Sequence, residues 1–432
     1  MAALIGHRPP TLMKKSGPHK FVLDNGVRVL MEPMGSVRSA AVGVWVDVGS
    51  RDEGQGEEGL SHFLEHMFFK GTRKRTAHAL AREIDVLGGE LNAFTSRENT
   101  AFYTKALDEH LPRAVALLGE IFLDSTFVRQ ELEREKQVVL EEIKMVEDDP
   151  EEFIYDLHTD LVWREHPLGR PILGEIPVIE SMTRKRLTEF LAQKYRPQNT
   201  VISVAGRFDP GAFENLIAKT FSRFDGGGTG PARRTPPTTR GGVFLKRKAL
   251  EQVHLCLGAQ GLPEGHKDRF SLHVLNTVLG GSVSSRLFQE VRERRGLAYS
   301  IYSSTASYQD AGLFTIYAAA GKAAAQRVIS LCLRECRSLR RRPVPKDELA
   351  HAKDHLKGSL ILGMEGTYSR MSRLAKDELY GGRHVSTTEI IHGIDAVTSD
   401  DLLRIANTCL APDTLALTVL GPMQRRDLPA AL

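Results

Sequence analysis

A long segment of the sequence occurs twice, and this duplication constrains the fold more than any other feature. Residues 178–206, VIESMTRKRLTEFLAQKYRPQNTVISVAG, align without gaps to residues 393–421, GIDAVTSDDLLRIANTCLAPDTLALTVLG, which lie 215 positions later. Each copy has a threonine at the start of an amphipathic helix, then a proline-containing turn and an alternating strand that ends in glycine. The chain is therefore predicted to contain one structural unit twice. The matching positions include Ile179/Ile394, Thr183/Thr398, Leu187/Leu402, Pro197/Pro412 and Gly206/Gly421.

Other segments of the two halves correspond in the same way. Residues 111–143 and 325–361 both have the pattern of a helix, a short break and a long helix, and each half begins with alternating strands, AAVGVWVDVGS and EQVHLCLGAQG. Between the halves, residues 225–242 are rich in Gly, Pro, Thr and Arg and have no apolar periodicity, which is typical of a linker. We therefore predict two homologous α+β domains, residues 1–224 and 243–432, each an antiparallel sheet with helices on one side.

Composition excludes several classes of function. With 41% hydrophobic and 26% charged residues and no apolar run of about 20 residues, the chain is predicted to be globular and not an integral membrane protein. A net charge of +4 is too small to predict binding to nucleic acid. The one dense basic run, residues 334–342, has no interleaved aromatic residues and is interpreted as a solvated helix end.

The cysteines and the N-terminal residues indicate the cellular compartment of the protein. Cys256, Cys332, Cys336 and Cys409 have no disulfide-framework or CxxC spacing, which predicts buried thiols and a reducing compartment. Residues 1–15 have an apolar stretch far shorter than that of a signal peptide and no Arg/Ser-rich amphipathic pattern. We expect a bacterial cytoplasmic protein, and a mature organellar matrix protein stays open.

Residues 59–72, GLSHFLEHMFFKGT, place His62, Glu65 and His66 on one face of a predicted helix. Histidines at i and i+4 can share one zinc ion, and Glu65 beside them could take a proton from a metal-bound water. Any surface helix, however, has polar residues opposite its apolar stripe. From this helix alone, a metal site and a solvated face are both open. The apolar stripe consists of Leu60, Phe63, Leu64, Met67 and Phe68.

The segment HAKDH is an internal control for this motif. His351 and His355 are also spaced i and i+4, with a carboxylate at i+3 and an apolar face opposite. Helix geometry therefore does not decide between the two interpretations. A third protein ligand would decide, because catalytic zinc generally has three.

The predicted helix over residues 130–146 supplies a candidate third ligand. Glu135 and Glu142, one heptad apart, fall within its apolar stripe, where a carboxylate is costly unless a cation or a hydrogen-bond donor meets it. The partner could be zinc or a buried Arg or Lys. Glu141 points about 100° away from Glu142 and is not selected. The stripe consists of Leu132, Val138, Val139, Ile143, Met145 and Val146.

The second half lacks these carboxylates. At an offset of 217, the counterparts of Glu135 and Glu142 are Ala352 and Ser359. The HAKDH helix thus corresponds to the helix of Glu142 and not to the helix of His62 and His66. We interpret its polar residues as a solvated face.

The segment HFLEH, followed after 75 residues by Glu142, resembles the inverted-motif zinc peptidases of the pitrilysin, insulin-degrading enzyme and mitochondrial processing peptidase family. The resemblance implies one Zn²⁺ per chain, held by His62, His66 and Glu142, with Glu65 as general base. It further implies that Glu135 is a carboxylate that supports the ligands. The likeness covers nearly the whole chain, including LDNGVRVL, GGELNAFTSRENTAFY, HPLGRPILG, RPQNTVISVAG and GGSVSSRLFQEVRERRGLAYSIYS.

The same resemblance implies two groups of substrate-binding residues. Asn92, Ala93 and Phe94 match a strand whose open edge pairs with the substrate backbone. An ordinary edge strand, with Phe94 in the core, is the alternative. Arg292 and Tyr299 match an Arg and a Tyr that reach the zinc site from the C-terminal region to hold the substrate carbonyl and the oxyanion.

The resemblance also implies a function and an assembly. We expect a zinc endopeptidase that hydrolyses short or unfolded peptides inside an enclosed chamber. Long family members have four such domains, whereas this chain has two, so we predict a homodimer in which Arg292 and Tyr299 of one subunit complete the zinc site of the other. Two alternatives stay open. One is a non-catalytic scaffold or partner subunit of the same fold, and the other is a presequence-processing peptidase that works with a separate homologous subunit.

Overall fold

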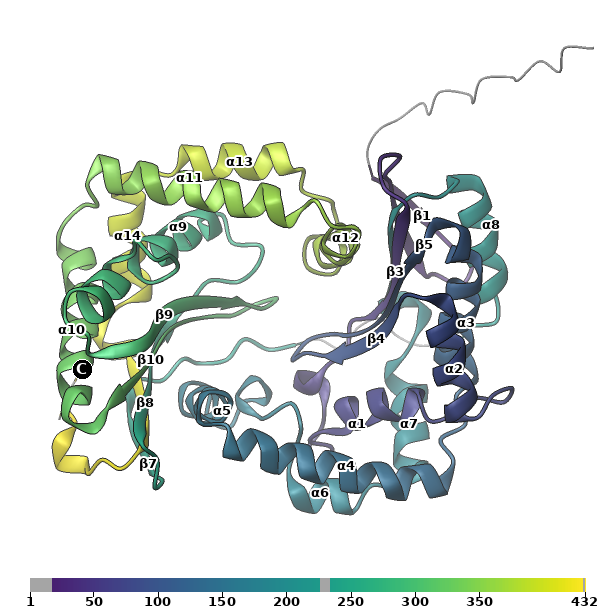
Figure 1. Ribbon diagram of the computed structural model, residues 1–432, viewed down its shortest axis with the longest axis horizontal. Coiled ribbons are helices and arrows are strands. Elements are labelled where there is room, and N and C mark those ends of the chain that lie inside the picture. The colour runs from purple at the N-terminus through teal and green to yellow at the C-terminus, as the bar shows by residue number, and fades with distance from the viewer. Residues whose placement is uncertain (1–17, 226–233, 430–431) are drawn as a thin grey trace, which may run out of the picture.

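Each half of the chain folds around its own β-sheet in the computed structural model, which describes residues 18–225, 234–429 and 432 (Figure 1). Residues 1–15, in which the sequence predicts no targeting signal, and residues 226–233 of the predicted linker lie outside the described residues. No helix in the described part of the chain is long and apolar enough to cross a membrane. All four cysteines are buried free thiols, as predicted.

The N-terminal sheet has six strands in the order β1-β2-β6-β3-β5-β4. Strand β4 is an edge strand, which pairs only with β5. Strands β2 and β6 run parallel, and the other neighbours are antiparallel. The bounds are β1 His19–Val22, β2 Arg28–Pro33, β3 Ser39–Val46, β4 Glu90–Thr95, β5 Thr100–Leu107 and β6 Thr200–Gly206.

The C-terminal sheet has five strands in the order β7-β11-β8-β10-β9, and here β7 and β11 are the parallel pair. The duplicated α+β architecture is confirmed, but each sheet is mixed where we predicted antiparallel strands throughout. The last strand of each half follows a helix instead of a hairpin, and such a crossover allows parallel pairing. The bounds are β7 Gly242–Arg247, β8 Gln252–Gln260, β9 Ala298–Ser307, β10 Gly312–Gly321 and β11 Ala416–Gly421.

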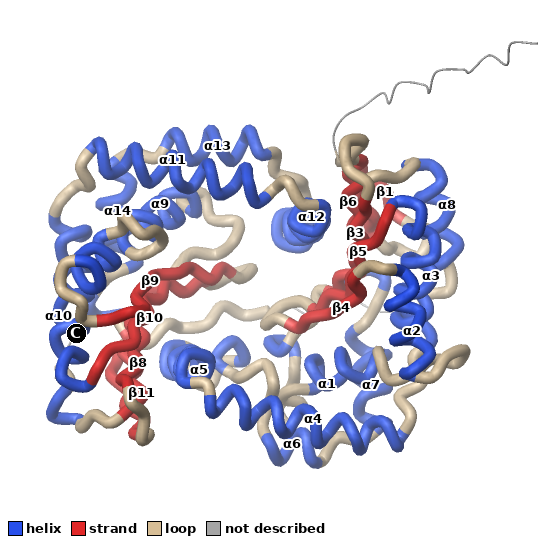
Figure 2. The backbone as a smooth tube through the Cα atoms, viewed as in Figure 1, coloured by secondary structure: helices blue, strands red, loops and turns tan. Residues whose placement is uncertain are grey.

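Helices surround both sheets (Figure 2). The duplicated segments begin their helices in the same way, because the Thr183 and Thr398 hydroxyls accept hydrogen bonds from the N–H groups three residues later. The N-terminal half contains α1 Leu60–Phe68, α2 Ala77–Leu87, α3 Leu111–Asp124, α4 Arg129–Asp148, α5 Pro150–Val162, α6 Ile176–Glu180, α7 Arg184–Lys194 and α8 Pro210–Phe221. The C-terminal half contains α9 Arg269–Leu279, α10 Lys322–Arg341, α11 Lys346–Gly363, α12 Thr367–Gly381, α13 Thr387–Ala396 and α14 Ser399–Cys409.

Each half has one helix that packs on the sheet of the other half, and we call this arrangement the helix exchange. Each sheet packs one face against helices of its own half, as predicted, and buries most of its apolar residues there. The other face of the N-terminal sheet is covered by α12 of the C-terminal half, and α5 of the N-terminal half covers the C-terminal sheet (Figure 1). The two small cores that result contain Trp45 with Met371 and Ile154 with Tyr317. The exchange joins the halves into one packed body.

Ion pairs at the boundary between the two halves reinforce this packing. The Glu378 carboxylate on α12 accepts hydrogen bonds from Lys20 and Arg28 at the N-terminal sheet, at 2.7 and 3.1 Å. Arg51 forms ion pairs with Glu98 of its own half and with Asp310 of the other, at 2.5 and 2.7 Å. These contacts hold the β4–β5 turn, which contains Glu98, against the C-terminal half.

Candidate metal centre

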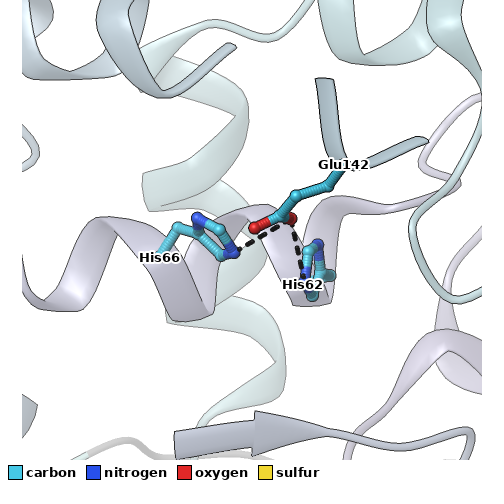
Figure 3. Close-up of side chains that lie close together, drawn as sticks. All are labelled: His62, His66 and Glu142. Carbon is cyan, nitrogen blue, oxygen red and sulfur yellow. Dashed lines mark ion pairs between the residues drawn. The ribbon is translucent and has the colours of Figure 1, made fainter. Parts of the chain in front are cut away.

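The helix α1 holds His62 and His66 on the face opposite its buried stripe (Figure 3). All five apolar residues predicted for that stripe are buried. The start of α1 is capped by Glu53, whose carboxylate accepts hydrogen bonds from the N–H groups of Gly59 and Ser61 at 2.9 and 2.6 Å. Burial raises the pKa of Glu53 to about 8, although these hydrogen bonds oppose the rise. No sequence pattern marks Glu53, because this cap reaches α1 from an irregular loop.

Glu142 of α4 faces the two histidines, as Figure 3 shows. Its Oε2 atom lies 3.8 Å from His62 Nε2 and 3.5 Å from His66 Nε2. Tetrahedral zinc with ligands at about 2.0–2.1 Å would separate its donors by roughly 3.4 Å. In the described part of the chain, these three residues form the single group of at least three His, Cys, Asp or Glu donors with metal-site spacing. His351 and His355 of the control segment are exposed and belong to no such group.

The chemistry of these donors fits a bound cation. Glu142 Oε2 is buried and has no hydrogen-bond donor among the described residues, and an ionised oxygen in that position is costly unless a cation meets it. Burial, with the charge of His66, lowers the pKa of His62 to about 3, so the imidazole stays neutral. A neutral imidazole is the form that binds a metal ion. These residues therefore fit zinc.

Glu135 is held by contacts on both of its oxygens. Its side chain is 5% exposed, with Oε2 3.1 Å from His66 Nδ1 and Oε1 2.7 Å from Lys70 Nζ. Burial would raise the pKa of Glu135, but the hydrogen bonds from His66 and Lys70 outweigh it and lower the pKa. For a carboxylate on this stripe, we considered zinc or a buried Arg or Lys as the partner. Glu135 pairs with a lysine and also orients a histidine of the candidate metal site. Lys70 was not predicted as a site residue, although it lies four residues after His66.

Glu65 stands beside the metal centre and is held by a hydroxyl. Thr95 Oγ1 donates a hydrogen bond to Glu65 Oε2 at 2.6 Å. Burial raises the pKa of Glu65, and the Thr95 hydrogen bond opposes the rise. A carboxylate with a raised pKa is suited to take up and release a proton near neutral pH.

The predicted stripe on α4 is only partly a core face. Leu132, Val139 and Ile143 are buried, but Val138 and Met145 are 43% and 69% exposed. Placing these two residues in the core was wrong. Periodicity groups apolar residues on one face of a helix, but it does not show how far the neighbouring elements cover that face.

Asn92, Ala93 and Phe94 lie on the open edge strand β4, as the resemblance implied. Asn92 is exposed, and its Oδ1 accepts a hydrogen bond from the Ala93 N–H at 2.8 Å. The Phe94 ring packs edge-on against Trp45, with ring centroids 5.5 Å apart. The packing of Phe94 agrees with the core alternative, whereas Asn92 is accessible to a ligand. Substrate contact stays a prediction for all three.

Arg292 and Tyr299 lie together in the C-terminal half. The Arg292 guanidinium carbon is 4.4 Å from the centroid of the Tyr299 ring, and Tyr299 is 75% exposed. Both line a shallow cavity of about 370 Å³, together with Gly281 and Tyr302. Among the described residues, no hydrogen bond, ion pair or ring contact joins Arg292 or Tyr299 to the three candidate metal ligands or to Glu65.

Comparison with known proteins identifies relatives along nearly the whole chain. Residues 28–176 match the family model described as Insulinase (Peptidase family M16), and residues 181–356 match the model described as Peptidase M16 inactive domain. An uncharacterized zinc protease of Bacillus subtilis is 42% identical over 405 residues, which cover 93% of this chain and 98% of that protein. An uncharacterized zinc protease of Streptomyces coelicolor is 38% identical and covers 97% of this chain and 94% of its own length.

Two solved structures share the fold. A protease from Helicobacter pylori has a TM-score of 0.87 at 23% identity and covers 94% of this chain and 100% of its own. A protein from Pseudomonas fluorescens, described as a peptidase M16 inactive domain, has a TM-score of 0.88 at 21% identity and covers 94% of this chain and 98% of its own. At these identities the likeness supports the fold alone.

Proposed function

The chain belongs to the M16 family of peptidases, and from this premise we propose that it is a zinc-dependent endopeptidase that hydrolyses short or unfolded peptides in an enclosed chamber. The observation that supports the proposal most is the convergence of His62, His66 and Glu142, whose donor atoms lie within 4.8 Å of one another. They come from two helices that are distant in sequence. Glu142 Oε2 is buried there without a hydrogen-bond donor from the described residues.

The catalytic roles follow from the contacts of each residue. Zinc, when bound, supplies a Lewis acid for a peptide carbonyl and for an attacking water. Glu65, held through Oε2 by Thr95, would accept a proton from the water at Oε1 and return it to the leaving amine. Glu135 holds His66 at Nδ1 and leaves Nε2 for the metal.

The class of substrate follows from the open edge of β4. A peptide can add to this edge as a further strand only where its own backbone is extended and unpaired. Short or unfolded peptides meet this condition, and the interior of a folded protein does not. Asn92 is placed to contact such a peptide.

We also propose that two copies of the chain work together. Arg292 is partly exposed and Tyr299 is exposed in the C-terminal half. Among the described residues, neither contacts the candidate metal centre of its own chain. That half has Ala352 and Ser359 in place of the carboxylates, so it does not repeat the site. In a homodimer, Arg292 and Tyr299 would serve the site of the partner, and a heterodimer with a homologous subunit is the alternative. We place the protein in the bacterial cytoplasm, because the relatives named above are bacterial and its cysteines are free thiols.

The test compares metal content and peptide cleavage in matched variants. We expect the wild type to bind one zinc per chain and to cleave an unstructured peptide library. Glu65→Gln should keep its zinc and lose about 10²–10⁴-fold in kcat, because it removes only the general base. Glu142→Gln should lose zinc, whereas Glu141→Gln, on the neighbouring exposed position of α4, should behave like the wild type.

Two results would overturn the proposal. One is a wild-type protein that neither binds a divalent metal nor cleaves any peptide in the library. The other is a Glu65→Gln variant as active as the wild type. Elemental analysis also separates zinc from the other divalent metals that a His/His/Glu site accepts.

A further inference from the structure

The hydrogen bond between Thr95 and Glu65 joins two parts of the site that have different tasks. Thr95 is the last residue of the edge strand β4, and Glu65 lies between the two histidines of α1. The donor and acceptor oxygens are 2.6 Å apart, which is short for a hydroxyl and a carboxylate and typical of a charge-assisted hydrogen bond. The strand that would bind a peptide is thus bonded directly to the residue that would act as general base.

The chain holds Thr95 firmly at the end of β4 that lies next to the turn. Thr95 pairs with Thr100 on β5, and the turn between them is closed by the hydrogen bond from Ser96 N–H to the Asn99 carbonyl at 2.8 Å. Ser50 N–H donates to the Ser96 carbonyl at 3.1 Å and ties this turn to a neighbouring loop. The backbone of Thr95 is therefore held from the β5 side, and its hydroxyl contacts Glu65.

The rest of β4 is restrained on one side only. It pairs with β5, and no strand of the described residues lies beside its other edge. Ala93, two residues before Thr95 and on the same face of the strand, packs against the core that contains α1. A peptide paired with the open edge would restrain β4 from the second side, and Thr95 with it.

We propose that Thr95 is a positioning residue that links the pairing of a peptide with β4 to the orientation of Glu65. The Glu65 side chain has three rotatable bonds, and the hydroxyl holds one oxygen in place while the other faces the proton to be transferred. Without the hydroxyl, the carboxylate samples orientations that do not reach that proton, and misplacement by about 1 Å costs up to about 100-fold in rate. This inference rests on the proposed peptidase function.

Three variants and two steady-state constants test the inference. Thr95→Val keeps the shape of the side chain and removes the donor, so kcat should fall about 10- to 100-fold while KM stays within about twofold. Thr95→Ser restores the donor and should recover kcat to within about threefold of the wild type. Zinc content and Tm should be unchanged in both variants. Thr188→Val, at a half-buried threonine on α7 whose hydroxyl donates to carbonyl groups of its own helix, is the control.

A second measurement tests the link to peptide pairing. Methylating a backbone nitrogen of the peptide, next to the cleaved bond, removes one donor to β4. In the wild type this change should lower kcat as well as raise KM, whereas in Thr95→Val it should raise KM alone. A structural role for Thr95 would instead lower Tm or zinc content and would not produce this difference.

The outcomes separate the inference from the proposed function. A wild type that cleaves peptides, together with a Thr95→Val variant of equal kcat, would overturn the inference and leave the peptidase function intact. A Thr95→Ser variant as slow as Thr95→Val would also overturn it, because the hydroxyl would then not be the active group. A wild type that cleaves no peptide would overturn the inference together with the function.

Discussion

We predict that His158, which lies between the two halves, lowers the free energy of unfolding in acid. It lies on α5, fully buried against the C-terminal sheet, with Nδ1 3.0 Å from Thr418 Oγ1 and Nε2 without a hydrogen-bond partner among the described residues. Burial lowers the pKa of His158 from 6.5 to about 3. The folded protein therefore keeps this imidazole neutral at a pH where the unfolded chain protonates it.

The size of the effect follows from linkage. Between about pH 6.5 and pH 3 the unfolded state binds one more proton at His158 than the folded state, so the free energy of unfolding decreases as the pH falls through 6.5. A pH of about 5 is about 1.5 units below the pKa of His158 in the unfolded chain. Each unit changes the free energy of unfolding by about 1.36 kcal/mol. His158 should thus remove about 2 kcal/mol of stability between about pH 8 and pH 5. Above about pH 8 its titration contributes nothing.

Urea unfolding of two variants isolates this contribution. The free energy of unfolding is measured by circular dichroism at about pH 8 and pH 5, with a chelator present so that metal binding does not contribute. His158→Asn should be less stable than the wild type at pH 8, and the difference should shrink by about 2 kcal/mol at pH 5. His351→Asn, at an exposed position on α11, should leave the wild-type pH dependence unchanged. A difference between wild type and His158→Asn that is equal at both pH values would refute the reasoning.

Two further predictions concern the metal centre. Lys70→Met should weaken zinc binding about tenfold, because the buried Glu135 loses one of its two partners, and competition with a chelator measures the change; unchanged affinity would contradict this role of Lys70. Mixed dimers of a Glu65→Gln subunit and an Arg292→Ala/Tyr299→Phe subunit, each nearly inactive alone, should regain activity; stable mixed dimers without activity would count against catalysis across the dimer.

The sequence predicted the parts of this fold that depend on local pattern. The duplication, the capped helices at Thr183 and Thr398, and the buried stripe of α1 all follow from periodicity and capping, and all are confirmed. The apolar stripe marked Glu142 as a carboxylate that needs a partner, but it left zinc and a buried Arg or Lys open. The family resemblance implied the approach of Glu142 to His62 and His66 that the structure shows.

Contacts between distant segments could not be predicted in this way. Glu53, Lys70 and Thr95 act through single hydrogen bonds or ion pairs whose partners are set by tertiary packing, and no periodicity marks them. The exposure of Val138 and Met145 has the same origin, since coverage by neighbouring elements decides it. The packing of α5 and α12 on the sheet of the other half was not predicted. Each helix has an ordinary amphipathic pattern, which does not indicate the sheet that the helix covers.

Two glycines nevertheless lie where a helix of one half packs on the sheet of the other half. Gly43 on β3 and Gly258 on β8 each face a helix of the other half, although they are not equivalent in the two copies. Gly43 pairs with Ser203, whose counterpart Thr418 pairs with Cys256. A Cβ atom at Gly43 would lie 2.8 Å from Met371 Sδ on α12, and one at Gly258 would lie 1.9 Å from His158 Nε2 on α5. Each sheet thus has a glycine at a position where a side chain would collide with the helix of the other half.

This reciprocal packing gives the C-terminal half a part in holding the metal site. The helix α4, which contains Glu142, ends at Asp148, and α5 begins two residues later at Pro150. Because α5 is buried on the C-terminal sheet, the position of the α4 end depends on a half that contributes none of the three candidate ligands. The C-terminal sheet therefore supports the position of Glu142, the candidate third ligand, through the chain itself.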